Sequence, residues 1–278
     1  MPPMSDPDPM AGRPPTPPAA AWRAGKGDPV PLAGGRGLAW RLGDLVFKPA
    51  DLAPEELAWQ AEVLPTVPAR DVRLSIPQRA LGGELVVDGW TAWSFLPGQH
   101  RAGRWLDVIA AGDRFHRALT GLARPAFLDG RTDPWAIGDR VAWDELPIEP
   151  YRDVPHVTRL ADRLLPVEAP NQLIHGDLTG NVLFANELAP GVIDLSLYWR
   201  PTAFASAIVL ADALVWEGAD ESILASAGDV GDLGQMLARA LIYRLVAAIE
   251  GGFEEGSAAI DQRYGPAVDV AVRLSGGR

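Results

Sequence analysis

The sequence predicts an α+β fold with two lobes, a small β-rich lobe over residues 30–96 and a larger, mainly helical lobe over residues 97–278. Short apolar runs separated by glycine-containing turns fill the first lobe, which is typical of antiparallel strands. Apolar residues at helical spacing fill most of the chain after residue 104. The length of 278 residues is close to the size at which one core gives way to two. Residues 1–29 are rich in proline, which predicts a disordered leader.

Three segments define the β-rich lobe. Residues 31–48 contain apolar runs interrupted by a glycine cluster and a second turn, which predicts a β-meander. Residues 54–64 place apolar side chains at helical spacing behind an acidic first turn, which predicts one helix. Residues 84–96 hold two β-rich runs joined by Asp88-Gly89, a dipeptide typical of a two-residue hairpin turn.

The second lobe combines long helices with short strands. Residues 104–121 place Leu106, Ile109, Ala110, Phe115 and Leu119 on one broad apolar face, and a second apolar stripe runs from Leu233 to Ile249. We expect both segments to be core helices. Between them lie three brief apolar runs flanked by turn residues, which predict buried strands. These runs are residues 172–174, 182–184 and 192–193.

Composition excludes several classes of protein. The net charge is −11, from 25 basic and 36 acidic residues, which disfavours nucleic acid and suits a neutral or cationic small molecule. The chain has no cysteine, so disulfides, a thiolate nucleophile and a cysteine-bound zinc are excluded. The apolar stretch 203–211 is far shorter than the ~20 residues that span a bilayer, and the proline-rich start lacks the features of a secretory signal. We therefore expect a cytoplasmic protein with no membrane segment, whose oligomeric state stays open.

The segment from Leu173 to Phe184 carries the strongest indication of chemistry. It places the carboxylate of Asp177 and the amide of Asn181 four residues apart in a polar turn between two apolar runs. A second carboxylate, Asp194, ends the next apolar run. Phosphoryl transfer needs a carboxylate that accepts a hydroxyl proton and oxygen ligands for Mg²⁺. Each residue alone is also compatible with an ordinary polar turn or a strand-ending cap.

The sequence His-Gly-Asp-Leu-Thr-Gly-Asn, residues 175–181, resembles the catalytic loop of the aminoglycoside phosphotransferase and choline kinase families. The Ile-Asp-Leu-Ser sequence around Asp194 resembles their metal-binding strand end. The resemblance implies a protein kinase-like fold, with Asp177 as catalytic base, Asn181 and Asp194 as magnesium ligands, and His175 as a brace of the loop. It also implies ATP and Mg²⁺ as cofactors. The acceptor would be a small-molecule hydroxyl, on an aminoglycoside, an amino sugar or an amino alcohol.

The resemblance also assigns nucleotide contacts near the start of the chain. Gly34, Gly35 and Gly37 resemble the loop that covers the phosphates, although Trp40 stands where a strict glycine motif has its third glycine and a tight hairpin is the alternative. Lys48, at the end of an apolar run, corresponds to the lysine that contacts the α and β phosphates. A lysine that protects an edge strand is the other interpretation.

Two further assignments complete the predicted nucleotide site. Glu56 or Glu62, both on the expected helix, would pair with the phosphate-binding lysine, and Glu56 gives the better alignment. Either glutamate could instead belong to a solvated helix face. The backbone of Ser94 and Leu96, in the segment joining the two lobes, would bond the adenine edge. This last assignment rests on the resemblance alone.

The resemblance weakens near the substrate region. Residues 197–202 replace the Gly-Asp-Pro sequence that follows the metal-binding strand in many of these kinases. Residues 127–153 carry acidic and aromatic side chains that are compatible with a rim for a cationic acceptor or with an ordinary solvated loop. A protein kinase-like activity is disfavoured because neither Asp-Phe-Gly nor Ala-Pro-Glu occurs. A nucleotide-binding regulatory protein without turnover is the alternative from another class.

Overall fold

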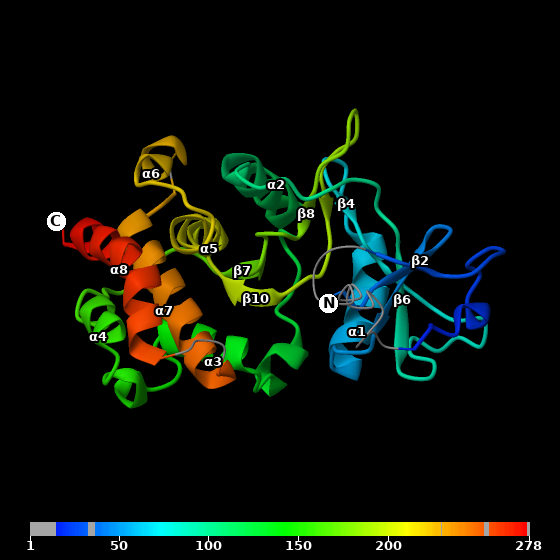
Figure 1. Cartoon of the computed structure of the whole chain (residues 1–278), viewed down its shortest axis with the longest axis horizontal. Helices are drawn as coiled ribbons and strands as arrows, with labels where there is room; N and C mark the ends of the chain where they lie inside the picture. The colour runs from blue at the N-terminus through cyan, green and yellow to red at the C-terminus, as the bar shows by residue number, and fades with distance from the viewer. Residues whose placement is uncertain (1–14, 33–36, 229, 253–255, 277–278) are drawn as a thin grey trace, which may run out of the picture. The chain divides into compact units, whose positions relative to one another are not determined.

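The computed structural model describes residues 15–32, 37–228, 230–252 and 256–276 (Figure 1). The chain divides into two compact units: unit 1 contains residues up to Val67 and Leu74–Pro97, and unit 2 contains Pro68–Arg73 and the residues from Gly98 onward. One unit is small and built on a sheet, and the other is larger and mainly helical, which confirms the predicted α+β fold. None of the helices within the described ranges combines the length and hydropathy needed to cross a membrane.

Unit 1 is built on a five-stranded antiparallel sheet with the order β1-β2-β3-β6-β5. Asp88 and Gly89 have φ values of 50° and 78°, and Val87 bridges Trp90, so the predicted two-residue turn is present. The strands are β1 (Val30–Pro31), β2 (Trp40–Leu42), β3 (Leu45–Pro49), β5 (Pro77–Gln78) and β6 (Trp90–Ser94).

The predicted helix of unit 1 is α1 (Pro54–Val63), which continues into a 3₁₀ turn, η2 (Leu64–Thr66). Proline at the first helical position and two glutamates in the first turn favour this start, because proline's φ suits a helix and carboxylates interact well with the helix N-terminus. The helix buries Leu57 and, with it, the side chain of Glu56.

Part of the proline-rich leader is ordered. Ala19–Ala21 form a 3₁₀ turn, η1, and Trp22 is only 3 % exposed. The indole of Trp22 packs edge-on against Phe47, with ring centroids 5.6 Å apart, and donates a hydrogen bond to the carbonyl of Gln78 at 3.0 Å. The prediction of a disordered leader is therefore wrong for these residues, whose Trp22 is buried against the sheet.

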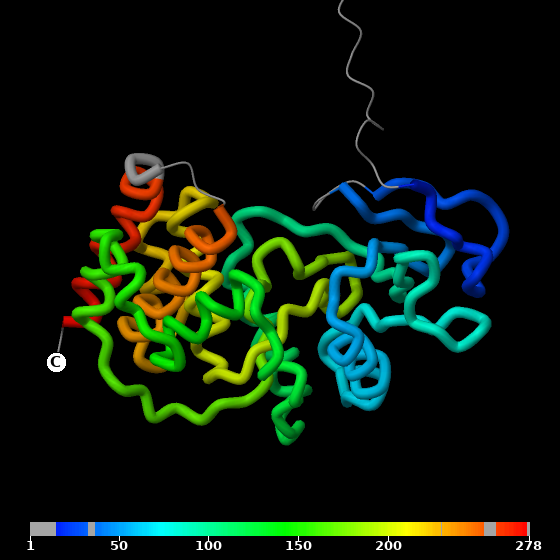
Figure 2. Tube along the Cα trace, turned by 90° about the horizontal axis from the view of Figure 1, so that it is seen from below, coloured from blue at the N-terminus to red at the C-terminus, as the bar shows by residue number. Residues whose placement is uncertain are grey.

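Unit 2 is a helical bundle centred on α7, which packs against α3, α5, α4 and α8 (Figures 1 and 2). Most side chains of α7 and α5 are buried, so the core of unit 2 lies around these two helices. The helices are α2 (Trp105–Ala118), α3 (Pro134–Ala142), α4 (Pro155–Ala161), α5 (Thr202–Val215), α6 (Ser222–Ser226), α7 (Leu233–Gly251) and α8 (Gly256–Ser275), with 3₁₀ turns η3 (Ala126–Gly130) and η4 (Glu149–Tyr151).

Short strands at one side of this bundle carry the loops that contain the predicted site. β7 (Gln172–His175) pairs antiparallel with β10 (Leu197–Arg200), and β8 (Val182–Leu183) pairs antiparallel with β9 (Gly191–Val192). The strand β4 (Arg73–Leu74) extends the second pair, since the amide of Arg73 donates to the carbonyl of Pro190 at 2.8 Å. Two loops, residues 176–181 and 193–196, connect these strands and contain the predicted site.

Candidate active site

Two buried histidines hold the loop that follows β7. The backbone N–H of Asp177 donates to Nδ1 of His175 at 3.1 Å, and Nε2 of His175 lies 3.2 Å from the carbonyl oxygen of Ile193. Because Nδ1 accepts a hydrogen bond, Nε2 carries the ring proton and donates it to Ile193. The backbone N–H of His175 in turn donates to Nε2 of His116, on α2, at 3.1 Å. Both side chains thus position the loop through the backbone.

Both histidines are neutral in the folded protein. Burial, with a smaller contribution from His175, lowers the pKa of His116 to about 3. Burial also lowers the pKa of His175, although the nearby carboxylates of Asp177 and Asp194 act in the opposite direction. A neutral ring is required for the hydrogen bonds described above, since a protonated ring has no acceptor.

The neutral state of His116 predicts a loss of stability in mild acid. Its folded pKa lies below the unfolded value of about 6.5, so the unfolded chain binds a proton that the folded chain does not, and stability falls as the pH falls below that value. We expect His116 alone to cost about 2 kcal/mol between pH 7 and pH 5. Urea unfolding at both pH values should show a smaller acid loss for His116→Gln than for the wild type. The exposed His100→Gln is the control, and identical acid losses in all three proteins would contradict the prediction.

Asp177 presents a half-exposed carboxylate that two donors hold from different sides. Its Oδ1 accepts a hydrogen bond from Nη2 of Arg244 at 2.9 Å, and its Oδ2 lies 3.2 Å from Nδ2 of Asn181. The same Nδ2 donates to the backbone carbonyl of Asp177 at 2.7 Å. This orientation of the amide leaves Oδ1 of Asn181 available as an oxygen ligand. The side chain of Asp177 is 40 % exposed and is accessible to a small molecule.

Asp194 lies in the neighbouring loop with an exposed side chain and a left-handed backbone, at φ 49°. The preceding amide, that of Ile193, donates to the carbonyl of Asn181 at 3.1 Å. This bond joins the backbones of the two loops that carry the predicted metal ligands, Asn181 and Asp194. Left-handed backbone is uncommon outside glycine and is concentrated at functional sites.

The donor set suits Mg²⁺ bound with a nucleotide. Within the described part of the chain, no three histidine or acidic side chains form a metal-binding cluster. Magnesium, however, is commonly bound by one or two protein oxygens together with substrate phosphates. The amide oxygen of Asn181 and the carboxylate of Asp194 fit that arrangement.

Arg244 and Asp212 were not predicted from the sequence. Arg244 on α7 forms a two-point ion pair with Asp212 on α5, with Nε–Oδ1 and Nη2–Oδ2 distances of 2.8 and 2.6 Å. The two side chains are 6 % and 5 % exposed. The available signal was Asp212 as the one charged residue of α5 and Arg244 within the apolar stripe of α7, because such residues are usually buried as pairs.

The predicted nucleotide residues of unit 1 differ in burial. Lys48 lies on β3, with Nζ 4.6 Å from the centre of the Trp93 ring. Glu56 is 5 % exposed, whereas the side chain of Glu62 is 71 % exposed and lies 3.8 Å from Arg79. Glu62 therefore lies on a solvated helix face, whereas Glu56 does not.

The backbone at the end of β6 has the hydrogen-bonding groups that an adenine edge requires. The N–H of Ser94 donates to the carbonyl of Ile76 at 2.9 Å, and its carbonyl accepts from Oγ of Ser75 at 2.8 Å. One lone pair of the Ser94 carbonyl stays available. The N–H and carbonyl of Leu96 make no hydrogen bond with another residue of the described segments.

The predicted phosphate-covering loop is described only at its end. Gly37 has a φ of 69°, in the left-handed region that glycine adopts readily. Gly34 and Gly35 lie outside the described residues.

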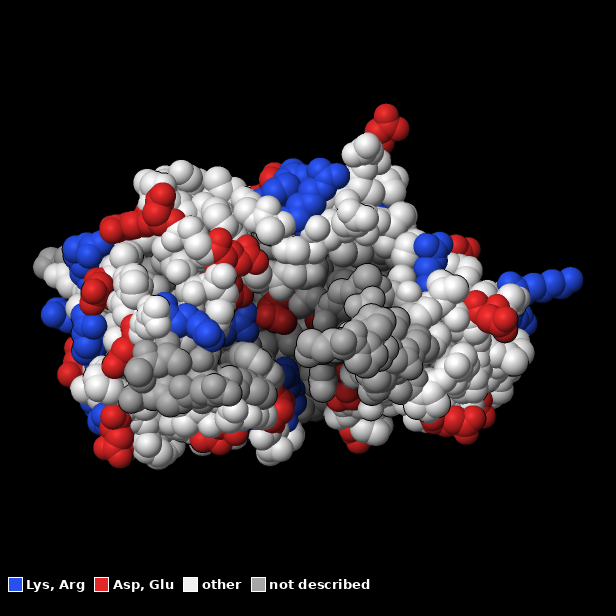
Figure 3. All heavy atoms as spheres, in the orientation of Figure 1, with Lys and Arg blue, Asp and Glu red and all other residues white. Residues whose placement is uncertain are grey.

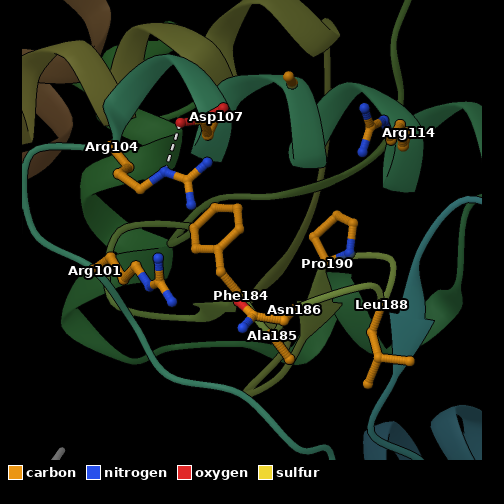
Figure 4. Close-up of a pocket in the computed structure, with 10 residues that line it drawn as sticks. Arg101, Arg104, Asp107, Arg114, Phe184, Ala185, Asn186, Leu188 and Pro190 are labelled. Atoms are coloured by element: carbon orange, nitrogen blue, oxygen red, sulfur yellow. Dashed lines mark hydrogen bonds and ion pairs between the residues drawn. The ribbon is translucent and has the colours of Figure 1, made fainter.

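A pocket of about 310 Å³ in unit 2 contains none of the predicted site residues. Arg101, Arg104 and Arg114 line it together with Phe184 (Figure 4). The guanidinium of Arg104 lies over the Phe184 ring, 4.4 Å from its centre, and pairs with Asp107 at 2.7 Å. Figure 3 shows basic side chains gathered over α2 on this face. The pocket is therefore separate from the residues predicted to take part in phosphoryl transfer.

Comparison with known proteins identifies the family to which the chain belongs. Residues 31–198, more than half of the chain, match the model of the phosphotransferase enzyme family. The chain therefore belongs to this family, which confirms the resemblance seen in the sequence. Among curated proteins, none is similar to the chain in sequence.

Solved structures of antibiotic phosphotransferases share the fold. A thermostable mutant of aminoglycoside phosphotransferase APH(4)-Ia, in its apo form, has 14 % identity and a TM-score of 0.60, over 91 % of this chain and 96 % of that one. Spectinomycin phosphotransferase APH(9)-Ia, in complex with ADP and spectinomycin, has 12 % identity and a TM-score of 0.53, over 92 % and 94 %. A further thermostable variant of APH(4)-Ia, in a ternary complex with AMP-PNP and hygromycin B, has 14 % identity and a TM-score of 0.59, over 90 % and 95 %.

Proposed function

We propose that the protein transfers the γ-phosphoryl group of ATP, with Mg²⁺, to a hydroxyl of a small molecule. The observation that carries the proposal is the half-exposed carboxylate of Asp177, held between two donors beside a pair of oxygen ligands. Asp177 would orient the acceptor hydroxyl and accept its proton. Family membership supports this class of reaction.

Asn181 and Asp194 would hold Mg²⁺, which neutralises charge on the phosphates when it is bound. The backbone N–H of Ile193 bonds the carbonyl of Asn181 and so joins the two loops. The side chains of the two ligands take no part in this bond. His175 contributes by fixing the backbone at Asp177 and does not reach the reacting atoms in this scheme. Its neutral ring bonds both loops at once.

Lys48 would contact the nucleotide phosphates and Glu56 would orient it. The burial of Glu56 supports its choice over Glu62, because a buried carboxylate needs a cation or strong donors, and an exposed one does not. Gly34, Gly35 and Gly37 would cover the phosphates through backbone amides. The carbonyl of Ser94 and the N–H of Leu96 would bond the adenine edge.

The acceptor site has less free negative charge than the sequence suggests. Most acidic side chains of residues 127–153 are already paired with arginines, so they attract a cation weakly. A neutral sugar therefore belongs among the candidate acceptors beside amino sugars, amino alcohols and aminoglycosides. The pairs are Asp129–Arg124, Asp133–Arg131, Asp139–Arg200, Asp144–Arg239 and Glu145–Arg200.

A nucleotide-consumption screen tests the proposal. ATP and Mg²⁺ would be incubated with hygromycin B, spectinomycin, glucosamine, glucose, choline and ethanolamine, and products would be analysed by mass. We expect acceptor-dependent ADP formation and a product heavier by one phosphoryl group. Tight nucleotide binding without any phosphorylated product over such a panel would favour a regulatory nucleotide-binding protein instead.

A further inference from the structure

Arg244 connects the proposed base to the core of unit 2. Its guanidinium is bound at two points by Asp212, and Nη2 also donates to Oδ1 of Asp177. Asp212 is buried and Asp177 is half-exposed, so the arginine joins a fixed carboxylate to an accessible one. The proposed function uses Arg244 only as one of two donors to Asp177 and assigns no role to its pair with Asp212.

We infer that Arg244 is a positioning residue, which holds the carboxylate of Asp177 in the orientation needed to receive the acceptor hydroxyl. This inference rests on the proposed function, in which Asp177 is the base. Arg244 bonds Oδ1 and Asn181 bonds Oδ2, so rotation of the carboxylate would break both hydrogen bonds. Each oxygen keeps a free lone pair, and one of them can accept the hydroxyl proton.

The orientation of Arg244 is itself fixed. The two bonds to Asp212 define the plane of the guanidinium, and a planar group held at two points fixes the direction of the second N–H of Nη2, which donates to Asp177. Three aromatic rings surround it, with the guanidinium carbon 5.3 Å from the centre of the Trp135 ring, 5.9 Å from that of Trp216 and 5.1 Å from that of Tyr243. Burial acts to lower the pKa of Arg244, but Asp212 and Asp177 hold it well above its usual range. The group is therefore a permanent cation in a fixed place.

A purely structural role is the competing explanation, because the Arg244–Asp212 pair also ties α7 to α5. Removing one partner of a buried ion pair strands a charge and destabilises the fold, whereas replacing both with apolar residues is often neutral. The double variant Arg244→Met/Asp212→Leu therefore separates the two roles. It removes both buried charges and leaves Asp177 without its arginine.

Gln235→Leu provides a control on the same helix. Gln235 is as buried as Arg244, at 1 % exposure, but its side chain accepts from the N–H of Leu165 and donates to the carbonyl of Arg163, both outside the proposed site. Its removal should reduce stability and leave kcat unchanged. Arg244→Lys keeps the charge but cannot reproduce the two-point bond and reach Asp177 as well.

The experiment measures thermal midpoint, nucleotide affinity, kcat and KM with an acceptor from the panel above. We expect the double variant to fold and bind ATP with Mg²⁺ like the wild type, while kcat falls by about 10²-fold, the typical effect of a small misplacement of a reacting group. Arg244→Lys should show a similar loss. Wild-type kcat in the double variant or in Arg244→Lys would overturn the positioning role and leave the proposed function standing. Absence of turnover by the wild type with every acceptor would instead overturn both.

Discussion

Asp177→Asn is expected to remove most of the turnover while the fold and the nucleotide affinity stay nearly unchanged. Asparagine keeps the size of the side chain and one oxygen, but an amide does not accept a proton at neutral pH. General-base contributions are typically about 10²- to 10⁴-fold, and we expect kcat to fall within that range. Steady-state kinetics with a confirmed acceptor, together with calorimetric titration of ATP and Mg²⁺, would measure the two effects separately.

Asp113→Asn serves as the control for this substitution, since Asp113 is an exposed carboxylate on α2. Its kcat should match that of the wild type. Near-normal kcat in Asp177→Asn would reduce Asp177 to a turn residue, and the catalytic interpretation of residues 175–181 would then be wrong.

Asp194→Ala is expected to weaken the binding of ATP in the presence of Mg²⁺ and to leave metal-free binding unchanged. In the proposed site the substitution removes a charged oxygen ligand from a hard cation, which is bound by few protein oxygens when phosphates supply the others. The loss should be at least about 10-fold, the lower end of the effect of residues that only support a metal ligand. Calorimetric titration of ATP over a series of Mg²⁺ concentrations, with an EDTA series beside it, measures the difference.

Glu187→Ala is a matched control for backbone strain. Glu187 is an exposed acidic residue with a left-handed φ of 60°, and it lies between β8 and β9, while Asp194 follows β9 with a φ of 49°. Any effect of replacing a left-handed acidic residue by alanine should appear in both variants, and only Asp194→Ala should change the magnesium dependence. An equal response of the two variants would argue against Asp194 as a ligand.

The sequence predicted those parts of the site that are local in the chain. Asp177 and Asn181 are four residues apart, and their loop is fixed by strands directly on either side, so a short segment was sufficient. Arg244 and Asp212 come from two helices that meet only in the tertiary structure, and nothing in either segment indicates the other. The same holds for two of the arginines that pair with acidic residues of 127–153, since Arg200 and Arg239 come from β10 and α7.

The helical spacing of apolar residues predicted where α2 lies in the chain. It predicted less well which side chains of the helix are buried. Leu106 is 39 % exposed and Ala110 is exposed, although the spacing places both on the apolar face. The helix buries Ile109 and Phe115 as predicted, but also Gly112 and His116, because Leu178 of the loop 176–181 approaches Gly112 so closely that a Cβ there would lie 2.5 Å from its Cδ1. The spacing of apolar residues within the helix cannot predict this contact, because the contact depends on where the loop that carries Leu178 lies in the folded chain.

The short connection between β9 and β10 has a consequence for control of the enzyme. Residues 193–196 are bonded at both ends, by Ile193 to Asn181 and by Ser196 to Gly176, and the chain then returns at once as β10 beside β7. Kinases that are switched by phosphorylation use a long segment at this place, which changes between ordered and disordered states. A four-residue connection held in this way offers no comparable second state. In the proposed enzyme we therefore expect no order–disorder switch at this connection.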